Sequence, residues 1–188
     1  MKSINRYINE RLILSKNKTE TKHTLFPKSV HELKAMITEE IKKNGVHCSL
    51  NHIDIYRLQD LDDLFLYSDF DGDISEWDTS NIKSMENTFA WSNYTGKYGD
   101  ISNWDVSNVK DMSYMFYTSN FTGKNSPGMD KWNVSNVEKM DSMFERSEFA
   151  QDISGWEIDP SCSTEAMFAH CPLSNKHEFI PQCLLRRI

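Results

Sequence analysis

Residue types that often bind metals or catalyse reactions are present in this chain, but their spacing matches no known site. The four cysteines, Cys48, Cys162, Cys171 and Cys183, lack the CxxC spacing of zinc and redox sites. No HExxH motif or paired ligand spacing occurs among the histidines, which are His23, His31, His47, His52, His170 and His177. We therefore predict free thiols, no metal, no cofactor and no enzymatic activity.

One acidic segment, Asp69-Phe70-Asp71-Gly72-Asp73, alternates carboxylates as calcium-binding loops do. Its glycine is misplaced for an EF-hand loop, and the bidentate glutamate that ends such a loop is missing. The pattern therefore favours a polar bend between two structural units over a calcium site.

Four aromatic residues are the candidate partner-binding side chains: Trp91, Tyr98, Tyr114 and Tyr117. They lie outside the repeated apolar pattern described below, and tryptophan and tyrosine are enriched at protein interface hot spots. The place of Trp91 in the repeat is held in other copies by Thr118, Arg146 and His170, so the core does not require an indole there. The alternative is that these rings fold back onto neighbouring loops.

An internal repeat runs through most of the chain. Four tryptophans are each followed after twelve residues by a phenylalanine, in the pairs Trp77/Phe89, Trp104/Phe116, Trp132/Phe144 and Trp156/Phe168. A degenerate earlier copy runs from Ile53 to Phe65, and the period varies between 24 and 28 residues. Such a period is typical of repeat proteins, in which neighbouring copies bury one another's apolar faces.

Within one repeat, the pattern changes from a period of two to a helical spacing. Trp104 and Val106 are two residues apart, which indicates a short strand. A short helix is indicated by the spacing of Val109, Met112, Met115 and Phe116. We therefore predict an α+β repeat solenoid of about five stacked turns of 24–28 residues, each a short strand plus a short helix, with an N-terminal helical cap.

Two repeats are longer than the others, and the extra residues fall in the same connection, between Tyr94 and Trp104 and between Phe121 and Trp132. Because equivalent connections lie on one side of a repeat array, we expect both insertions to project from one face. Tyr98 lies in the first insertion.

The repeat pattern resembles that of the BspA-like leucine-rich-repeat family of bacterial surface proteins. The resemblance rests on the segments Gly72–Phe89, Gly99–Phe116 and Gly128–Phe144, and it covers about residues 24–173. It implies a right-handed leucine-rich-repeat solenoid that binds a protein or a matrix without catalysis. It also implies a location at the cell surface.

The ends of the chain suggest four parts: residues 1–23, 24–50, 51–173 and 174–188. In the second, Ser29 and Glu32 form a capping box, and the pattern predicts a helix that ends at Asn44–Gly45 and covers the first repeat. The spacing of Ile4, Ile8 and Leu12 predicts an amphipathic helix in the first part, which either docks the protein to an assembly or packs on the cap. The fourth part is expected to fold over the last repeat.

Charge is divided unevenly along the chain. Residues 1–50 carry a net charge of +5 and residues 51–188 a net charge of −12. An acidic body repels nucleic acid, and no apolar run approaches the length of a membrane span. No signal peptide is recognisable, which favours a cytoplasmic location, in contrast to the surface location that the resemblance implies.

These observations favour a non-enzymatic protein-protein interaction module that binds an unidentified protein through the exposed face of the acidic solenoid. An alternative is a structural or packaged component of a larger assembly, addressed by its N-terminal helix. A third hypothesis, a glycan hydrolase with paired carboxylates, would require two acids that face each other across a cleft.

Overall fold

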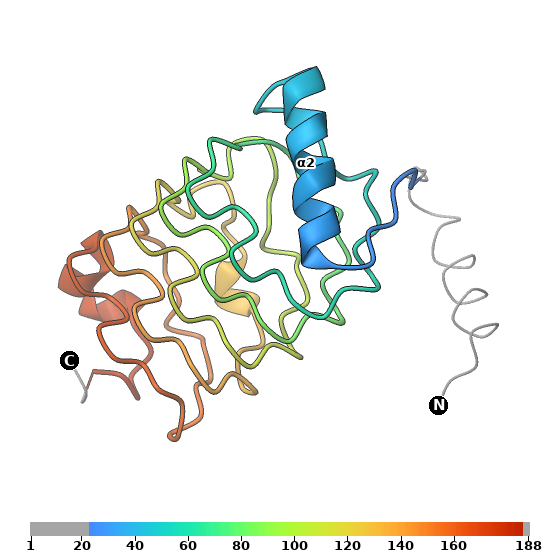
Figure 1. Ribbon diagram of the computed structural model, residues 1–188. Helices are drawn as coiled ribbons and strands as arrows, with labels where there is room; N and C mark the ends of the chain where they lie inside the picture. The colour runs from blue at the N-terminus through green and yellow to red at the C-terminus, as the bar shows by residue number, and fades with distance from the viewer. Residues whose placement is uncertain (1–22, 186–188) are drawn as a thin grey trace, which may run out of the picture.

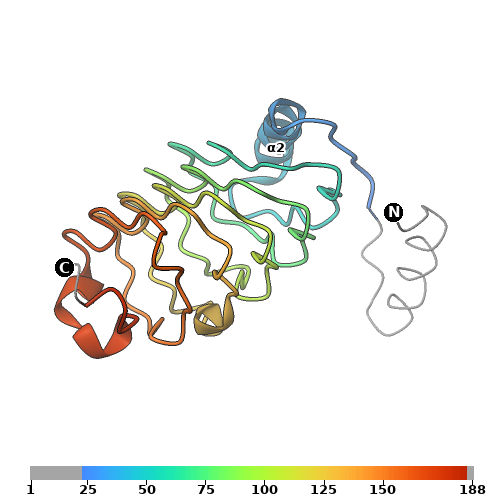
Figure 2. The same cartoon turned by 90° about the horizontal axis from the view of Figure 1, so that it is seen from below.

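The computed structural model describes residues 23–185, which form a row of repeats lying side by side (Figure 1). The described chain contains one α-helix, α2 (Val30–Asn44), and three short 3-10 helices, η2 (Met129–Lys131), η3 (Pro172–Asn175) and η4 (His177–Phe179). Helix α2 lies at one end of the row, and the C-terminal segment lies at the other (Figure 2). The helix predicted from Ile4, Ile8 and Leu12 lies outside the described residues.

Helix α2 begins and ends where the sequence predicts. The Ser29 side chain accepts a hydrogen bond from the Glu32 N–H at 3.2 Å, and the Glu32 carboxylate accepts one from the Lys28 N–H at 2.8 Å. The helix ends at Gly45, whose φ of 85° is accessible to glycine without steric cost. Its apolar face buries Leu33 and Ile37 in the common core.

The predicted α+β architecture of the repeats is wrong. In the described chain the repeats contain neither a continuous strand nor an α-helix, and consecutive repeats are joined by isolated parallel bridges. Four of these bridges form one line through the molecule: Asp60–Ser84, Ser84–Asp111, Asp111–Lys139 and Lys139–Ser163. The repeats are therefore mostly irregular coil built from tight turns.

Backbone conformation explains why the segment from Met112 to Thr118 is not a helix. Tyr114 and Thr118 have φ values of 57° and 50°, in the left-handed region, which interrupts a right-handed helix. The equivalent pairs in the other repeats are also left-handed: Asp63/Tyr67, Asn87/Trp91, Ser142/Arg146 and Ala166/His170. The apolar residues with helical spacing therefore face the core from a series of turns and not from one helix.

Successive N–H groups in these segments alternate between two kinds of acceptor. The Tyr114 N–H donates to a carbonyl of the next repeat at 2.9 Å, whereas the Met115 N–H donates three residues back to Met112 at 3.2 Å. We call residues 61–67, 85–91, 112–118, 140–146 and 164–170 the ladder segments. Four N–H···O=C bonds of 2.8–3.1 Å join each of the first four ladder segments to the next repeat, where they end on the next ladder segment or on the residue just before it.

The core is built from side chains at equivalent repeat positions. One stack consists of Phe65, Phe89, Phe116, Phe144 and Phe168, with neighbouring ring centroids 5.3–6.2 Å apart. A second stack consists of Phe70, Tyr94, Phe121 and Phe149, at 6.0–6.4 Å. Offset aromatic stacks of this kind add to the burial free energy of each ring.

The polar corners of the repeats provide hydrogen bonds, as the sequence predicts. The Asp105 carboxylate accepts a bond from the Ser107 N–H at 3.0 Å, which closes the corner, and Asn108 Nδ2 donates to the Ser80 carbonyl of the preceding repeat at 2.7 Å. The Asn136 amide makes the same bond to Ser107 at 2.8 Å. These polar residues therefore hold consecutive repeats together.

The described part of the C-terminal segment folds over the last repeat. Ile180 and Leu184 are buried in the common core, and the Ile153 N–H donates to the Phe179 carbonyl at 3.0 Å.

The four cysteines are free thiols.

Candidate functional site

Four exposed or half-buried rings form a contiguous group along the ladder segments, which we call the aromatic row: Tyr67, Trp91, Tyr117 and Tyr114. The rings of Tyr67 and Trp91 are stacked with their centroids 6.0 Å apart. Trp91 meets Tyr117 edge to face at 5.7 Å, and Tyr117 meets Tyr114 in the same way at 5.7 Å. Tyr67 is 71% exposed, Trp91 48% and Tyr114 39%, so the row presents aromatic surface to solvent.

The left-handed corners of the repeats position this row. Tyr67 and Trp91 occupy equivalent corners, and their N–H groups donate to the carbonyls of Ala90 at 3.1 Å and Tyr117 at 2.8 Å. A left-handed backbone favours glycine or asparagine and costs other residues about 1–2 kcal/mol. The fold requires the corner conformation but not an aromatic side chain, since His170 and Arg146 occupy the same corner in later repeats.

Tyr98 does not join the aromatic row. Its ring contacts His47, with centroids 4.6 Å apart, and Lys97 Nζ lies 5.0 Å from its centroid. It is 42% exposed, so part of the ring remains accessible beside the loop that follows α2. Three of the four predicted residues are therefore brought together, and the fourth is placed separately.

The insertions fold back more than the sequence predicts. In the second insertion, Met129 is buried and the Ser126 hydroxyl accepts a hydrogen bond from the Ile101 N–H at 3.1 Å. In the first, the Tyr94 hydroxyl donates to the Gly99 carbonyl at 3.2 Å. Both insertions are thus tied to the body of the molecule.

Sequence reasoning missed Tyr67, the most exposed ring of the row. The signal was available, because Tyr67 follows Phe65 by two residues just as Trp91 follows Phe89. The degenerate first repeat hid this equivalence.

Three carboxylates, those of Asp62, Glu86 and Asp111, lie at the start of consecutive ladder segments or just before it. Burial raises the pKa of Glu86 above its usual value, and the negative charges of Asp111, Asp62 and Asp63 raise it further. Burial also raises the pKa of Asp62, although bonds from Ser84 and Glu86 oppose this. For Asp111, burial acts in the same direction, but the hydrogen bond from Lys139 at 2.9 Å helps to leave its pKa lowered.

Replacing Glu86 by glutamine should stabilise the protein at neutral pH. The pKa of Glu86 is raised in the folded protein, so folding disfavours its ionised form. The protonated carboxyl therefore favours the folded state below the unfolded-state pKa, and this contribution to the free energy of unfolding is lost as the pH rises through the folded-state pKa. We expect E86Q to gain less than about 1 kcal/mol at pH about 7, since solvent screens this partly exposed group. The gain should vanish below about pH 4.

Thermal unfolding at both pH values measures this difference. The matched control is Glu157→Gln, at an exposed glutamate of the last repeat, which should change the melting temperature little at either pH. A gain in E86Q that persists unchanged in acid would contradict the electrostatic explanation.

The acidic segment Asp69–Asp73 is occupied by structural hydrogen bonds. The Asp71 carboxylate accepts bonds from the N–H and hydroxyl of Thr95, at 2.8 and 2.9 Å. The Asp73 carboxylate accepts bonds from Asn51 at 2.8 Å and from the Ser75 N–H at 3.0 Å. Within residues 23–185, no group of three or more His, Cys, Asp or Glu side chains is arranged to hold a metal ion.

One hollow brings together side chains that could act in catalysis. It has a volume of about 570 Å³ and is lined in part by Arg146, Glu148, His170 and Cys171. The Cys171 thiol is 3% exposed, and burial raises its pKa, so its reactive thiolate is disfavoured. This geometry does not favour a cysteine nucleophile.

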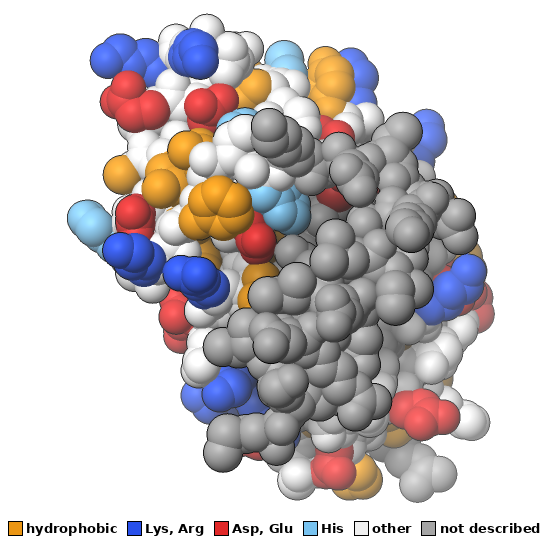
Figure 3. Space-filling view, turned by 90° about the vertical axis from the view of Figure 1, so that its right-hand side faces the viewer, with side chains coloured by type: hydrophobic (Ala, Val, Ile, Leu, Met, Phe, Trp, Pro, Cys, Tyr) orange, Lys and Arg blue, Asp and Glu red, His pale blue; other side chains and the backbone are white. Residues whose placement is uncertain are grey.

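The described surface at the α2 end of the molecule mixes basic, acidic and hydrophobic side chains and does not gather lysine and arginine into one area (Figure 3). Among the described helices, none has the length and apolarity to cross a membrane.

Comparisons with known proteins identify a family. The chain matches the family described as "Mycoplasma protein of unknown function, DUF285" twice, over residues 31–126 and 92–178. No curated protein and no solved structure matches it. The resemblance to BspA-like proteins stays a prediction, because none of these results addresses it. Since the two overlapping matches span most of the chain, the protein belongs to the DUF285 family.

Proposed function

We propose that this chain is a non-enzymatic protein-binding module and that the aromatic row is its contact surface. The observation that carries this proposal is that the rings of Tyr67 and Trp91 stack on one another outside the core, at corners where the fold needs no aromatic side chain. Exposed tryptophan and tyrosine supply large rigid contact area and are enriched among interface hot spots.

The flanking side chains suit a protein partner. The same line of corners continues through Arg146 and His170, both exposed, and the exposed carboxylate of Asp63 lies on the first ladder segment. An aromatic centre with charged residues at its rim is the usual composition of a protein interface.

Replacing Trp91 by alanine should weaken partner binding strongly while leaving the fold intact. The indole is 48% exposed, and the backbone bond from residue 91 to the Tyr117 carbonyl does not depend on the side chain. Loss of a hot-spot ring costs about 2 kcal/mol or more, which corresponds to a roughly 30-fold weaker Kd. Affinity capture from the source cells, followed by mass spectrometry and titration with the captured partner, measures the effect.

The matched control is Phe26→Ala, which removes an equally exposed ring (50%) outside the row. A partner retained by wild type and F26A but lost by both W91A and Tyr67→Ala supports the proposal. Equal capture by all variants contradicts it, and loss only in Tyr98→Ala would transfer the contact surface to the first insertion.

A further inference from the structure

The two ends of the row of repeats carry complementary backbone groups that have no hydrogen-bond partner within residues 23–185. Inside the molecule, each of the first four ladder segments donates four N–H groups to carbonyls of the next repeat. Among the described residues, no further ladder segment follows residues 164–170. The four equivalent N–H groups of this last segment have no acceptor among the described residues; they belong to Thr164, Ala166, Phe168 and His170.

In the first ladder segment and the residue just before it, carbonyl acceptors and not N–H donors lack a described partner. The carbonyls that would accept from a preceding repeat receive no hydrogen bond from any described residue; they belong to Asp60, Asp62, Leu64 and Leu66. The bonds that tie the segment before α2 to the first repeat involve Thr24, His52, Leu25 and Asp54, and they do not reach these carbonyls. In the part of the chain that the structure describes, one end therefore has four donors without an acceptor, and the other has four acceptors without a donor at the equivalent repeat positions.

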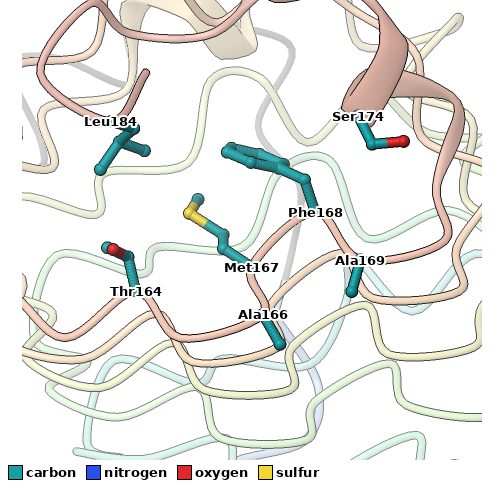
Figure 4. A pocket seen from close by; sticks show the side chains of 7 residues that line it. All are labelled: Thr164, Ala166, Met167, Phe168, Ala169, Ser174 and Leu184. Carbon is teal, nitrogen blue, oxygen red and sulfur yellow. The ribbon is translucent and has the colours of Figure 1, made fainter. Parts of the chain in front are cut away.

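Apolar space adjoins the donor end. A hollow of about 270 Å³ lies beside the last ladder segment and is lined by Met167, Phe168 and Leu184 among others (Figure 4). The described C-terminal segment pairs with residue 153, through the Phe179 carbonyl, and accepts no hydrogen bond from the N–H groups of Thr164, Ala166, Phe168 and His170. Unpaired edges of this kind are templates for pairing with another chain.

We propose that the protein self-associates head to tail, with the donor edge at residues 164–170 of one copy paired to the acceptor edge at residues 60–66 of a second copy. This goes beyond the proposed function, because it uses the ends of the row and not the aromatic row. The occupant is a second copy because the docked edges would repeat the four backbone hydrogen bonds that join consecutive ladder segments within the chain. Such an interface is heterologous, so it generates rings or open chains and not a closed two-fold dimer.

The register of the internal interfaces specifies which side chains meet. Within the chain, the backbone N–H of Ser142 donates to the Glu165 carbonyl. The equivalent bond between two copies would run from the Ala166 N–H to the Asp62 carbonyl. That pairing brings the exposed Asp63 of one copy beside the exposed Ala166 of the other. It also brings Asp63 near Glu165, so association should tighten as salt screens this repulsion.

A charge swap tests this register. Ala166→Glu places a second negative charge opposite Asp63, and Ala166→Lys, of similar length and at the same exposed position, places a positive one. We expect sedimentation equilibrium of the wild type to show a mass that rises with concentration beyond that of a dimer. The association constant should be at least tenfold lower for A166E and close to that of the wild type for A166K. It should recover when A166E is combined with Asp63→Lys.

A mixing experiment tests the head-to-tail geometry. A166E keeps an intact acceptor edge, so it should cap growing chains and shorten wild-type assemblies when added in a substoichiometric amount. Circular dichroism melts of each variant verify folding. The proposal is overturned if the wild type remains monomeric at high concentration in both low and high salt, if A166E and A166K weaken association equally, or if the assembly stops at a dimer that A166E does not shorten.

Discussion

Trp104→Ala should destabilise the protein by about 3–5 kcal/mol, the usual cost of removing a buried aromatic ring. Trp104 is 3% exposed in the middle of the row of repeats, and its ring lies 6.4 Å from that of Trp77 and 6.1 Å from that of Phe89. Its indole N–H donates to the Ile74 carbonyl of the preceding repeat at 3.2 Å. The substitution therefore opens a cavity and removes a bond between two repeats.

Chemical denaturation followed by circular dichroism measures this loss. Trp91→Ala is the matched control, because it makes the same substitution at an indole that is 48% exposed and outside the core. We expect W91A to cost far less than W104A. Similar unfolding midpoints for the two variants would show that Trp104 is not a core residue.

Gly72→Ala should have the second largest effect. A β-carbon at this position would overlap the Cys48 carbonyl oxygen, and it would lie 2.6 Å from the nearest atom of the Phe70 ring. Residue 72 lies between Asp71 and Asp73, whose N–H groups donate to the Val46 and Cys48 carbonyls at 3.0 and 3.1 Å. The nearest clashing atom belongs to the backbone and not to a flexible side chain. The clash can therefore be removed only if the segments around residues 48 and 72 move apart.

We expect G72A to lose about 3 kcal/mol, at the upper end of the usual range for overpacking. The matched control is Gly155→Ala, where a β-carbon would meet its nearest neighbour, the Asp130 carbonyl oxygen, at an ordinary 3.5 Å. Denaturant midpoints of the two variants compare the effects. A G72A protein as stable as G155A would contradict the close approach of residues 48 and 72.

The repeat register was predictable because it depends on residue type alone. The tryptophans and phenylalanines that recur twelve residues apart, such as Trp104 and Phe116, are all buried. Large apolar side chains must leave water, so their spacing reports which positions face the core. Helix α2 was predictable for a similar reason, since the capping bonds of Ser29 and Glu32 are local in sequence.

The conformation of each repeat was not predictable from spacing. Val109, Met112, Met115 and Phe116 fit one face of a helix, but Tyr114 and Thr118 are left-handed, and the N–H groups of the segment bond to the next repeat. A local pattern cannot distinguish a helix from a series of turns that is stabilised by a neighbour more than twenty residues away. The α+β prediction failed at this point.

The candidate site was predictable in part. Trp91, Tyr114 and Tyr117 could be chosen because they lie outside the core register, and the structure brings their rings together. Tyr67 was missed because its repeat is degenerate, and Tyr98 was grouped with the others although its ring packs against His47. Adjacency between repeats depends on how they stack, which single repeats do not encode.

The sequence by itself determined which residues are buried, where the one described α-helix begins and ends, and how the charge is divided along the chain. These properties follow from side-chain polarity and from hydrogen bonds between near neighbours. Only the tertiary structure decided that the repeats are coil, that four rings form one row at the surface, and that donors and acceptors without a partner in residues 23–185 lie at opposite ends. Those features arise from backbone bonds between repeats, which form only when the repeats lie side by side.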